Sequence, residues 1–209
     1  MTQVLVTDDE VVALAAKADG AWPVPLPTVE RQPDVLRVSG MRGIRSLAVR
    51  GLADTGTPGA VLYDEGLVDL VSSITRAEDR VLAFVARRDG IFQPRGALVG
   101  AFRASGESWI IDSMTGNGVH AIWGGPASEA AEAIARFAQA VWESGVSSPE
   151  GSEALGLVVA SSDDSKPVRF VAKGQVSDLS VVPGEPPMVF EAGDREEPLS
   201  QEEVAELFG

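Results

Sequence analysis

His120 is the only histidine of the chain, and the chain has no cysteine. Zinc sites draw on several histidine and cysteine ligands, so this composition predicts no zinc site of the usual kind. A Ser-His-Asp triad would have to use His120, but the Gly-x-Ser-x-Gly turn that presents such a serine is absent from the sequence. A single histidine between Val119 and Ala121 is more typical of a surface or hydrogen-bonded structural residue. We therefore predict no catalytic residue, no metal and no cofactor.

The glycine-containing segments do not match nucleotide-binding loops. Gly40-x-x-Gly43 and Gly116-x-Gly118 lack the complete glycine fingerprint of dinucleotide-binding domains, and no Gly-x4-Gly-Lys-Ser/Thr loop is present. The pair Asp163-Asp164 could bind a cation, but it fits a solvated hairpin turn better. We predict a non-enzymatic protein. The alternative that stays open is an enzyme whose site uses carboxylates or backbone groups.

Arginines gather in one span of an otherwise acidic chain, and they are Arg76, Arg80, Arg87, Arg88, Arg95 and Arg103. They can form a solvated outer sheet face, which discourages pairing between sheet edges, or a basic face for an acidic protein partner. Ile91 and Phe92 lie in the connection between two predicted strands, where polar residues are expected. They either pack into the fold or anchor a partner. Our hypothesis is a partner surface made by Ile91, Phe92, Arg87, Arg88 and Arg95.

The overall composition limits the classes of partner. The chain has 209 residues, of which 44% are hydrophobic, and this suits one domain with a substantial core. Its formal net charge is -14, from 31 acidic and 17 basic residues, which disfavours nucleic acid and anionic membrane surfaces. No apolar run approaches the ~20 residues of a membrane-spanning helix, and the N-terminal segment lacks the features of a signal peptide. We expect a cytoplasmic protein without membrane insertion.

Apolar and polar residues alternate from residue 79 to residue 124, in segments of strand length separated by Gly, Asp and Asn. This period of two is typical of an antiparallel sheet with one buried face. We predict two sets of strands, at about 80–88, 96–104, 108–114 and 118–124, and then at 154–160, 167–173, 175–182 and 188–191. Asn117-Gly118 favours a tight turn between two of them, because glycine tolerates positive φ.

Helices are predicted at about 8–18, 34–53, 62–76 and 127–144, with a short helix after Ser200. Thr7 with Glu10, and Ser200 with Glu203, match the capping box that begins a helix. One apolar stripe of the helix at 127–144 is expected to face a sheet and be largely buried, and it contains Ile134, Phe137 and Val141. The proline-rich segment 22–27 is expected to be extended, either as a rigid crossing over the core or as a docking site for a proline-binding domain.

Strand runs and helix runs are segregated along the chain, which favours an α+β fold and not a parallel doubly wound sheet. Each half reads as a strand meander followed by a helix. We therefore predict antiparallel meanders with flanking helices in a pseudo-duplicated architecture. The chain would form a single domain over residues 1–209, with a first half at about 1–145 and a second half at about 146–209.

Residues 45–54, RSLAVRGLAD, resemble the S-L-x-x-R-G-L helix end of EspG proteins, the chaperones of type VII (ESX) secretion in actinobacteria. Residues 67–74, LVDLVSSI, followed by residues 77–81, AEDRV, are similar to the next helix and strand entry of that family. The opening strand, the capped helix and the Trp-Pro segment are similar too. The resemblance covers about residues 4–145, and the rest matches only in the order of its elements. The second half is also shorter than in typical members.

The resemblance implies an α+β fold with quasi-twofold halves. It also implies a cytosolic chaperone that binds a PE–PPE heterodimer, covers an aggregation-prone tip of the PPE protein and delivers the pair to the secretion system. No site residue is carried over from the family. The alternative is a protein-interaction or regulatory module of another purpose. The oligomeric state stays open, with a homodimer as one option.

Overall fold

The computed structural model describes residues 3–57, 60–87, 94, 96–144, 155–163, 168–172, 175–180, 188–190 and 197–208. The helices are α1 (Asp8–Lys17), α2 (Pro33–Val49), α3 (Glu65–Thr75), α4 (Ala127–Glu143) and α5 (Gln201–Ala205). The strands are β1 (Val4–Thr7), β2 (Ala53–Asp54), β3 (Leu62–Tyr63), β4 (Arg80–Arg87), β5 (Leu98–Ser105), β6 (Ser108–Met114), β7 (Val119–Pro126), β8 (Leu155–Ser161), β9 (Val168–Ala172), β10 (Gln175–Ser180) and β11 (Met188–Phe190).

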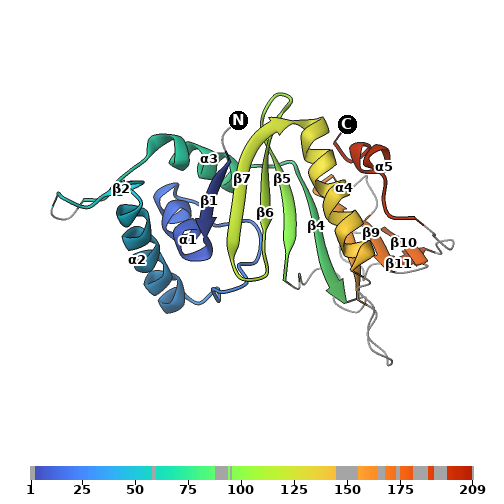
Figure 1. Ribbon diagram of the computed structural model, residues 1–209, viewed down its shortest axis with the longest axis horizontal. Helices are drawn as coiled ribbons and strands as arrows, with labels where there is room; N and C mark the ends of the chain where they lie inside the picture. Colours follow the sequence, from blue (N-terminus) through green and yellow to red (C-terminus); the bar gives the residue numbers. More distant parts are fainter. Residues whose placement is uncertain are drawn as a thin grey trace.

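One antiparallel sheet runs through the molecule in the order β1-β7-β6-β5-β4-β8-β9-β10-β11 (Figure 1). Consecutive strands pair within β4–β7 and again within β8–β11, which confirms both predicted meanders and the α+β fold class. The two meanders join through β4 and β8, whose register runs from Val81 opposite Ser161 to Arg87 opposite Leu155. β2 and β3 form a separate two-stranded hairpin.

Helices cover both faces of the central strands. Val81 and Ala83 of β4 pack in the core under α4 and α5, whereas Phe84 and Ala86 pack in the core under α1–α3. In Figure 1, α1–α3 gather toward one end of the molecule, and α4 and α5 lie toward the other. The prediction of a half-buried sheet is therefore wrong for these strands. Alternation in the sequence separates two buried faces here, each with its own helical cover.

The first helix begins and is covered as the sequence predicts. The Oγ1 of Thr7 accepts from the N–H of Glu10, and the Glu10 carboxylate accepts from the N–H of Thr7, so the capping box is formed. Trp22, Val24 and Leu26 are buried over α1 and the sheet. The proline-rich segment therefore crosses the core, with alternate side chains turned inward.

Two predicted helix boundaries are wrong. The predicted helix at 34–53 ends at Val49, and Ala53 belongs to β2. The predicted helix at 62–76 begins only at Glu65, because Asp64 caps it with an Oδ1 that accepts from the N–H of Leu67 at 2.9 Å. A side-chain cap at Asp64 and strand pairing at Ala53 set these two helix ends, and the spacing of apolar residues shows neither of them.

The predicted stripe of α4 is confirmed in position and only partly in burial. Ile134 is fully buried against the sheet, whereas Phe137 and Val141 are half-buried at the margin of the same core. Ser200 and Glu203 form the predicted capping box of α5. None of the helices in the described residues combines the length and apolar character required to cross a membrane.

Candidate functional site

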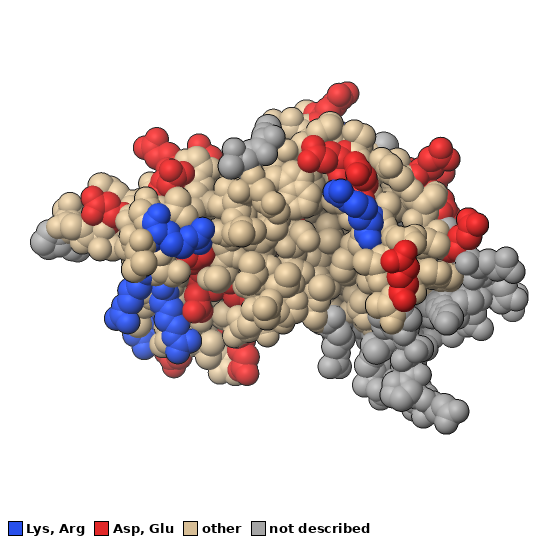
Figure 2. All heavy atoms as spheres, viewed as in Figure 1, with Lys and Arg blue, Asp and Glu red and all other residues tan. Residues whose placement is uncertain are grey.

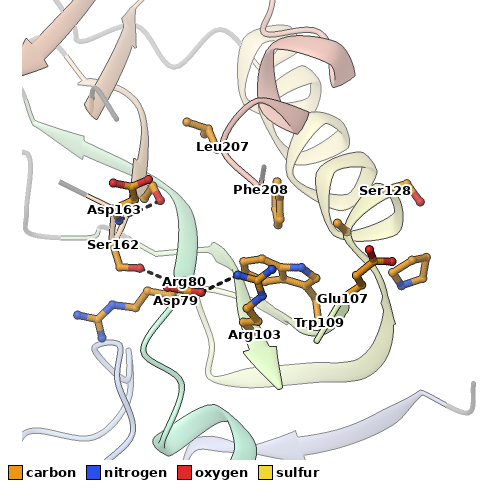
Figure 3. Close-up of a pocket in the computed structure, with 13 residues that line it drawn as sticks. Asp79, Arg80, Arg103, Glu107, Trp109, Ser128, Ser162, Asp163, Leu207 and Phe208 are labelled. Atoms are coloured by element: carbon orange, nitrogen blue, oxygen red, sulfur yellow. Dashed lines mark hydrogen bonds and ion pairs between the residues drawn. The ribbon is translucent and has the colours of Figure 1, made fainter. Parts of the chain in front are cut away.

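A pocket of about 530 Å³ opens at one edge of the sheet, between α4 and α5 (Figure 3). β4 and β6 begin there, and β5, β7 and β8 end there, because antiparallel neighbours alternate in direction. The first residues of α4 and the residues that follow α5 complete the wall. The lining residues are Asp79, Arg80, Arg103, Glu107, Trp109, Pro126, Ala127, Ser128, Ser161, Ser162, Asp163, Leu207 and Phe208.

Arg103 lies over an aromatic floor. Its Nη1 pairs with Asp79 Oδ2 at 2.9 Å, and its Nε donates to the carbonyl oxygen of Gly106 at 2.9 Å. Its guanidinium carbon lies 5.7 Å from the ring centre of Trp109. The Trp109 and Phe208 rings meet edge to face, with centres 4.7 Å apart. The guanidinium is thus oriented before any ligand arrives, by two hydrogen bonds and a cation–π contact.

The opposite wall is made of serines that hold β4 and β8 together. Ser162 Oγ accepts from the N–H of Arg80 at 2.8 Å, and the N–H of Ser162 donates to the carbonyl oxygen of Arg80 at 2.8 Å. Ser161 Oγ accepts from the N–H of Asp163 at 3.2 Å. These hydroxyls act as hydrogen-bond acceptors for backbone groups. They shape the pocket through these contacts with the backbone.

The beginning of α4 adds a positive helix end to this pocket. Pro126 occupies the N-cap position and makes no side-chain cap bond, so it leaves the first N–H groups of α4 uncapped at the end where Ala127 and Ser128 line the pocket. Glu129 is directed to the strand instead, where its Oε1 accepts from Trp123 Nε1 at 2.9 Å. Three acidic and two basic residues also line the pocket, so its surface is charged but mixed. It suits a ligand with an apolar group and polar edges.

His120 lies away from this pocket, in a buried ion cluster under α1–α3. Its Nδ1 is 3.0 Å from both carboxylate oxygens of Asp112, and its Nε2 is 2.8 Å from Asp8 Oδ1. All three residues are buried. Asp8 also accepts from the N–H and the hydroxyl of Thr28, at 2.8 and 2.6 Å. Of the two interpretations of His120, a surface residue is therefore wrong and a hydrogen-bonded residue is confirmed.

The carboxylates decide the protonation of this histidine. Burial alone would lower the pKa of His120, but hydrogen bonds with Asp112 and Asp8 raise that pKa to about 9. Burial also opposes the charge of Asp8, yet hydrogen bonds from His120 and Thr28 keep the pKa of Asp8 below its ordinary value. Burial raises the pKa of Asp112. At neutral pH the imidazolium donates from both ring nitrogens, so it joins the start of α1 to β6 and β7.

The structure separates the arginines that the sequence groups. Arg80 and Arg103 line the pocket, while Arg76 donates from Nη2 to the carbonyl oxygen of Ala18 at 3.5 Å. Arg87 ends β4, so its backbone lies ~23 Å from that of Arg80 at the rise of an extended strand. Of the described arginine side chains, Arg80 and Arg103 therefore share the pocket and Arg76 does not, while Arg88 and Arg95 lie outside the described residues. Within the described residues, no group of three or more His, Cys, Asp or Glu side chains is placed to hold a metal ion.

The hypothesised partner surface lies almost wholly outside the described residues. Ile91, Phe92, Arg88 and Arg95 are not among those residues, and only Arg87 is, as the last residue of β4. The surface stays a prediction. Sequence reasoning did not identify the pocket centre, because Trp109 and Phe208 lie far apart in the chain. The register of Arg103 opposite Trp109 follows from the β5–β6 hairpin, and it is the one local signal that could have indicated the site.

Neither protein-family models nor curated proteins match this chain. The strand order and the geometry of the pocket are therefore the observations on which a function can be proposed.

Proposed function

We propose that this chain is a cytoplasmic, non-enzymatic chaperone of the EspG type, which binds a PE–PPE heterodimer and delivers it to a type VII secretion system. The observation that carries the proposal is the strand order. β4 and β8 lie side by side at the junction of two four-stranded meanders. Each meander is followed by a helix, α4 or α5, and both helices pack in the same core. This order is what a pseudo-duplicated EspG-like chain would have.

An approximate twofold axis would pass between β4 and β8. These two strands are antiparallel, as neighbours related by an axis perpendicular to the sheet must be. The axis would relate β5 to β9, β6 to β10, β7 to β11 and α4 to α5. The two halves differ in helix length, since α4 has 17 residues and α5 has 5. A shortened second half agrees with the departure from typical family members in the sequence.

The pocket supports contact with a protein client. Trp and Arg are enriched among the few residues that dominate the energy of protein interfaces, and here Arg103 lies fixed over Trp109. Phe208 adds a half-buried apolar side chain to the same wall. We propose that an apolar side chain of the client enters this pocket. The predicted surface at Ile91 and Phe92 would form a second contact.

The test is co-expression of a PE–PPE pair from the source genome with and without this chain. We expect the chain to raise the soluble amount of the PPE protein and to elute with the pair as one complex. A PPE protein that is equally soluble alone, together with separate elution, would contradict the proposal. Stable co-elution with an unrelated protein in place of the PE–PPE pair would favour the alternative, an interaction or regulatory module of another purpose.

Matched variants distinguish specific binding at the client surface from non-specific binding through exposed apolar side chains. Ile91→Ser with Phe92→Ser is expected to weaken client binding about tenfold, which corresponds to about 1.4 kcal/mol. The control is Val49→Ser with Leu62→Ser, because these side chains are 89% and 61% exposed and lie on α2 and β3. The control should bind as the wild type does. An equal loss of client affinity in both double variants would mean that Ile91 and Phe92 are not part of the client surface.

A further inference from the structure

A second hollow, of about 650 Å³, lies between α1 and α2, away from the pocket of Figure 3. Buried apolar side chains form its base, among them Ala13, Ala15, Trp22 and Leu26. Half-buried and exposed side chains form its walls and rim, among them Val12, Leu36, Met41, Ile44 and Tyr63. We call this hollow the α1–α2 groove.

Small residues explain why the groove is open. The two helices are closest at Gly43, where an added Cβ would lie 2.0 Å from the carbonyl oxygen of Asp9. Further along, Gly40 lies next to Val12 with ordinary van der Waals spacing. Ala16, on the α1 side, adds only a methyl group to the lining. The helix pair is thus tight at one end and leaves an apolar channel along the other.

The charge of the groove is opposite to that of the chain. Its charged lining residues are Lys17, Arg31 and Arg37, and no carboxylate lines it, although the chain has 31 acidic and 17 basic residues. Arg31 is fixed by hydrogen bonds from Nη2 to the carbonyl oxygens of Trp22 and Val24, at 3.0 and 2.8 Å. Asp34 approaches Arg37 only to 4.0 Å, and both side chains are exposed. The charged residues that line the apolar channel are therefore all basic.

The basic surface continues along α2. Arg42 and Arg45 are exposed on this helix, and Figure 2 shows Lys and Arg gathered over the end of the molecule that α2 occupies. The apolar surface also extends outside the groove lining, since Met41 at the rim is 44% exposed and Val38, on the same helix, is 37% exposed. A small molecule enclosed in the groove would leave that apolar extension uncovered, whereas a protein segment would cover it.

We propose that the α1–α2 groove binds an acidic amphipathic helix of a protein partner. The stretch from Leu36 to Ile44 spans about 12 Å of helix axis, which matches the rise between the i and i+7 anchors of an amphipathic helix, about 10.5 Å. The apolar face of the partner helix fills the channel, and the carboxylates of that helix face Lys17, Arg31 and Arg37. This proposal does not rest on the chaperone function.

The test uses two synthetic helical peptides with the same leucine stripe, one with glutamate and one with lysine at the remaining positions. Each has about 18 residues, because shorter helices are marginal in water, and carries a fluorescent label. The net charge of -14 would draw the lysine peptide to the chain non-specifically. Specific binding at the groove predicts the reverse order, with the glutamate peptide at least about tenfold tighter by fluorescence anisotropy. Equal affinity, or tighter binding of the lysine peptide, would overturn the proposal.

Charge reversals locate the binding. Lys17→Glu with Arg37→Glu should weaken binding of the glutamate peptide about tenfold, and Met41→Ser should weaken it severalfold. Arg42→Glu with Arg45→Glu is the control, because it makes the same change in net charge on α2 but outside the groove lining. It should lower the affinity for the glutamate peptide by less than about threefold. An equal loss in both double variants would mean a bulk charge effect and would overturn the proposal. Self-association of the unliganded chain that Met41→Ser abolishes would assign the groove to a second copy instead.

Discussion

Two buried ion clusters fix the way in which the N-terminal helices join the sheet. In one, His120 lies between Asp8 and Asp112, so a single side chain connects the start of α1 with two strands. In the other, the buried carboxylate of Glu10 accepts from Ser46 Oγ at 2.7 Å and from Arg50 Nη1 at 2.7 and 2.9 Å. Both clusters use the first turn of α1. Their role is to hold elements in place, and neither is open to a ligand.

The pKa of His120 can be measured directly, because the chain has only one histidine. Its raised pKa, about 9 against 6.5 in the unfolded chain, means that its charge stabilises the fold fully below pH 6.5. That stabilisation is lost as the pH rises through about 9. We expect the single histidine ring signal in an NMR titration to shift near pH 9, and the free energy of unfolding to fall between pH 7 and 9.

The variant His120→Asn supplies the control for this measurement. It should be less stable than the wild type at pH 7, and it should lack the fall in stability that the histidine causes toward pH 9. A ring signal that titrates near 6.5, or an equal pH dependence of the stability of the two proteins, would show that Asp8 and Asp112 do not raise the pKa of His120.

Arg50 and Arg103 form two ion pairs that differ mainly in burial. Arg50→Met would leave the buried carboxylate of Glu10 without its cation, and would also remove the bond to the carbonyl oxygen of Leu5 at 2.7 Å. We expect a loss of about 3 kcal/mol in the free energy of unfolding. Arg103→Met removes an ion pair whose carboxylate, Asp79, is half-exposed, so it should cost less than about 1 kcal/mol. Urea denaturation of both variants checks the difference, and equal costs would contradict the account of burial.

At the scale of elements, the two glycines of α2 have opposite roles. Gly43 allows the backbones of α1 and α2 to touch, whereas Gly40 borders the α1–α2 groove with space beside it. From the sequence, both glycines only weaken the prediction of a helix. The structure gives a reason for one of them, since a side chain at Gly43 would collide with the backbone of Asp9.

Alanine at each glycine tests this packing. Gly43→Ala should destabilise the protein by about 1–3 kcal/mol or more, because the helices must move apart. Gly40→Ala should stabilise it by about 0.5–1 kcal/mol, because alanine is the better helix former and its Cβ meets Val12 at an ordinary distance. Thermal denaturation of the two single variants is the measurement. The same sign of shift in both melting temperatures would contradict the helix packing.

Most elements could be predicted from the sequence, because local signals define them. The capping boxes at Thr7 and Ser200 mark helix starts, and the alternation in β4–β7 marks strands with turns such as that at Gly118, whose φ is 76°. The second covered face of the sheet could not be predicted, because apolar and polar alternation does not say what packs outside. The site depends on Trp109 meeting Phe208, and no local pattern connects residues so far apart.

At the scale of the whole molecule, the sheet is continuous from β1 to β11 and the two meanders share the β4–β8 pair. The helices form two separate covers, α1–α3 on one face and α4 with α5 on the other. The proposed contacts follow this division. The pocket at Arg103 belongs to the α4–α5 side, and the α1–α2 groove belongs to the other side, so a client and a second partner could bind at the same time.

The central claim is that the chain recognises a PE–PPE heterodimer, and isothermal titration calorimetry of the two purified components tests it most directly. We expect saturable one-to-one binding with a Kd of about 1 µM or tighter, equivalent to about -8 kcal/mol. The Ile91→Ser, Phe92→Ser variant should bind about tenfold more weakly with an unchanged melting curve. No heat of binding, and no joint elution at concentrations ~10 times higher than that Kd, would contradict the assignment as a secretion chaperone.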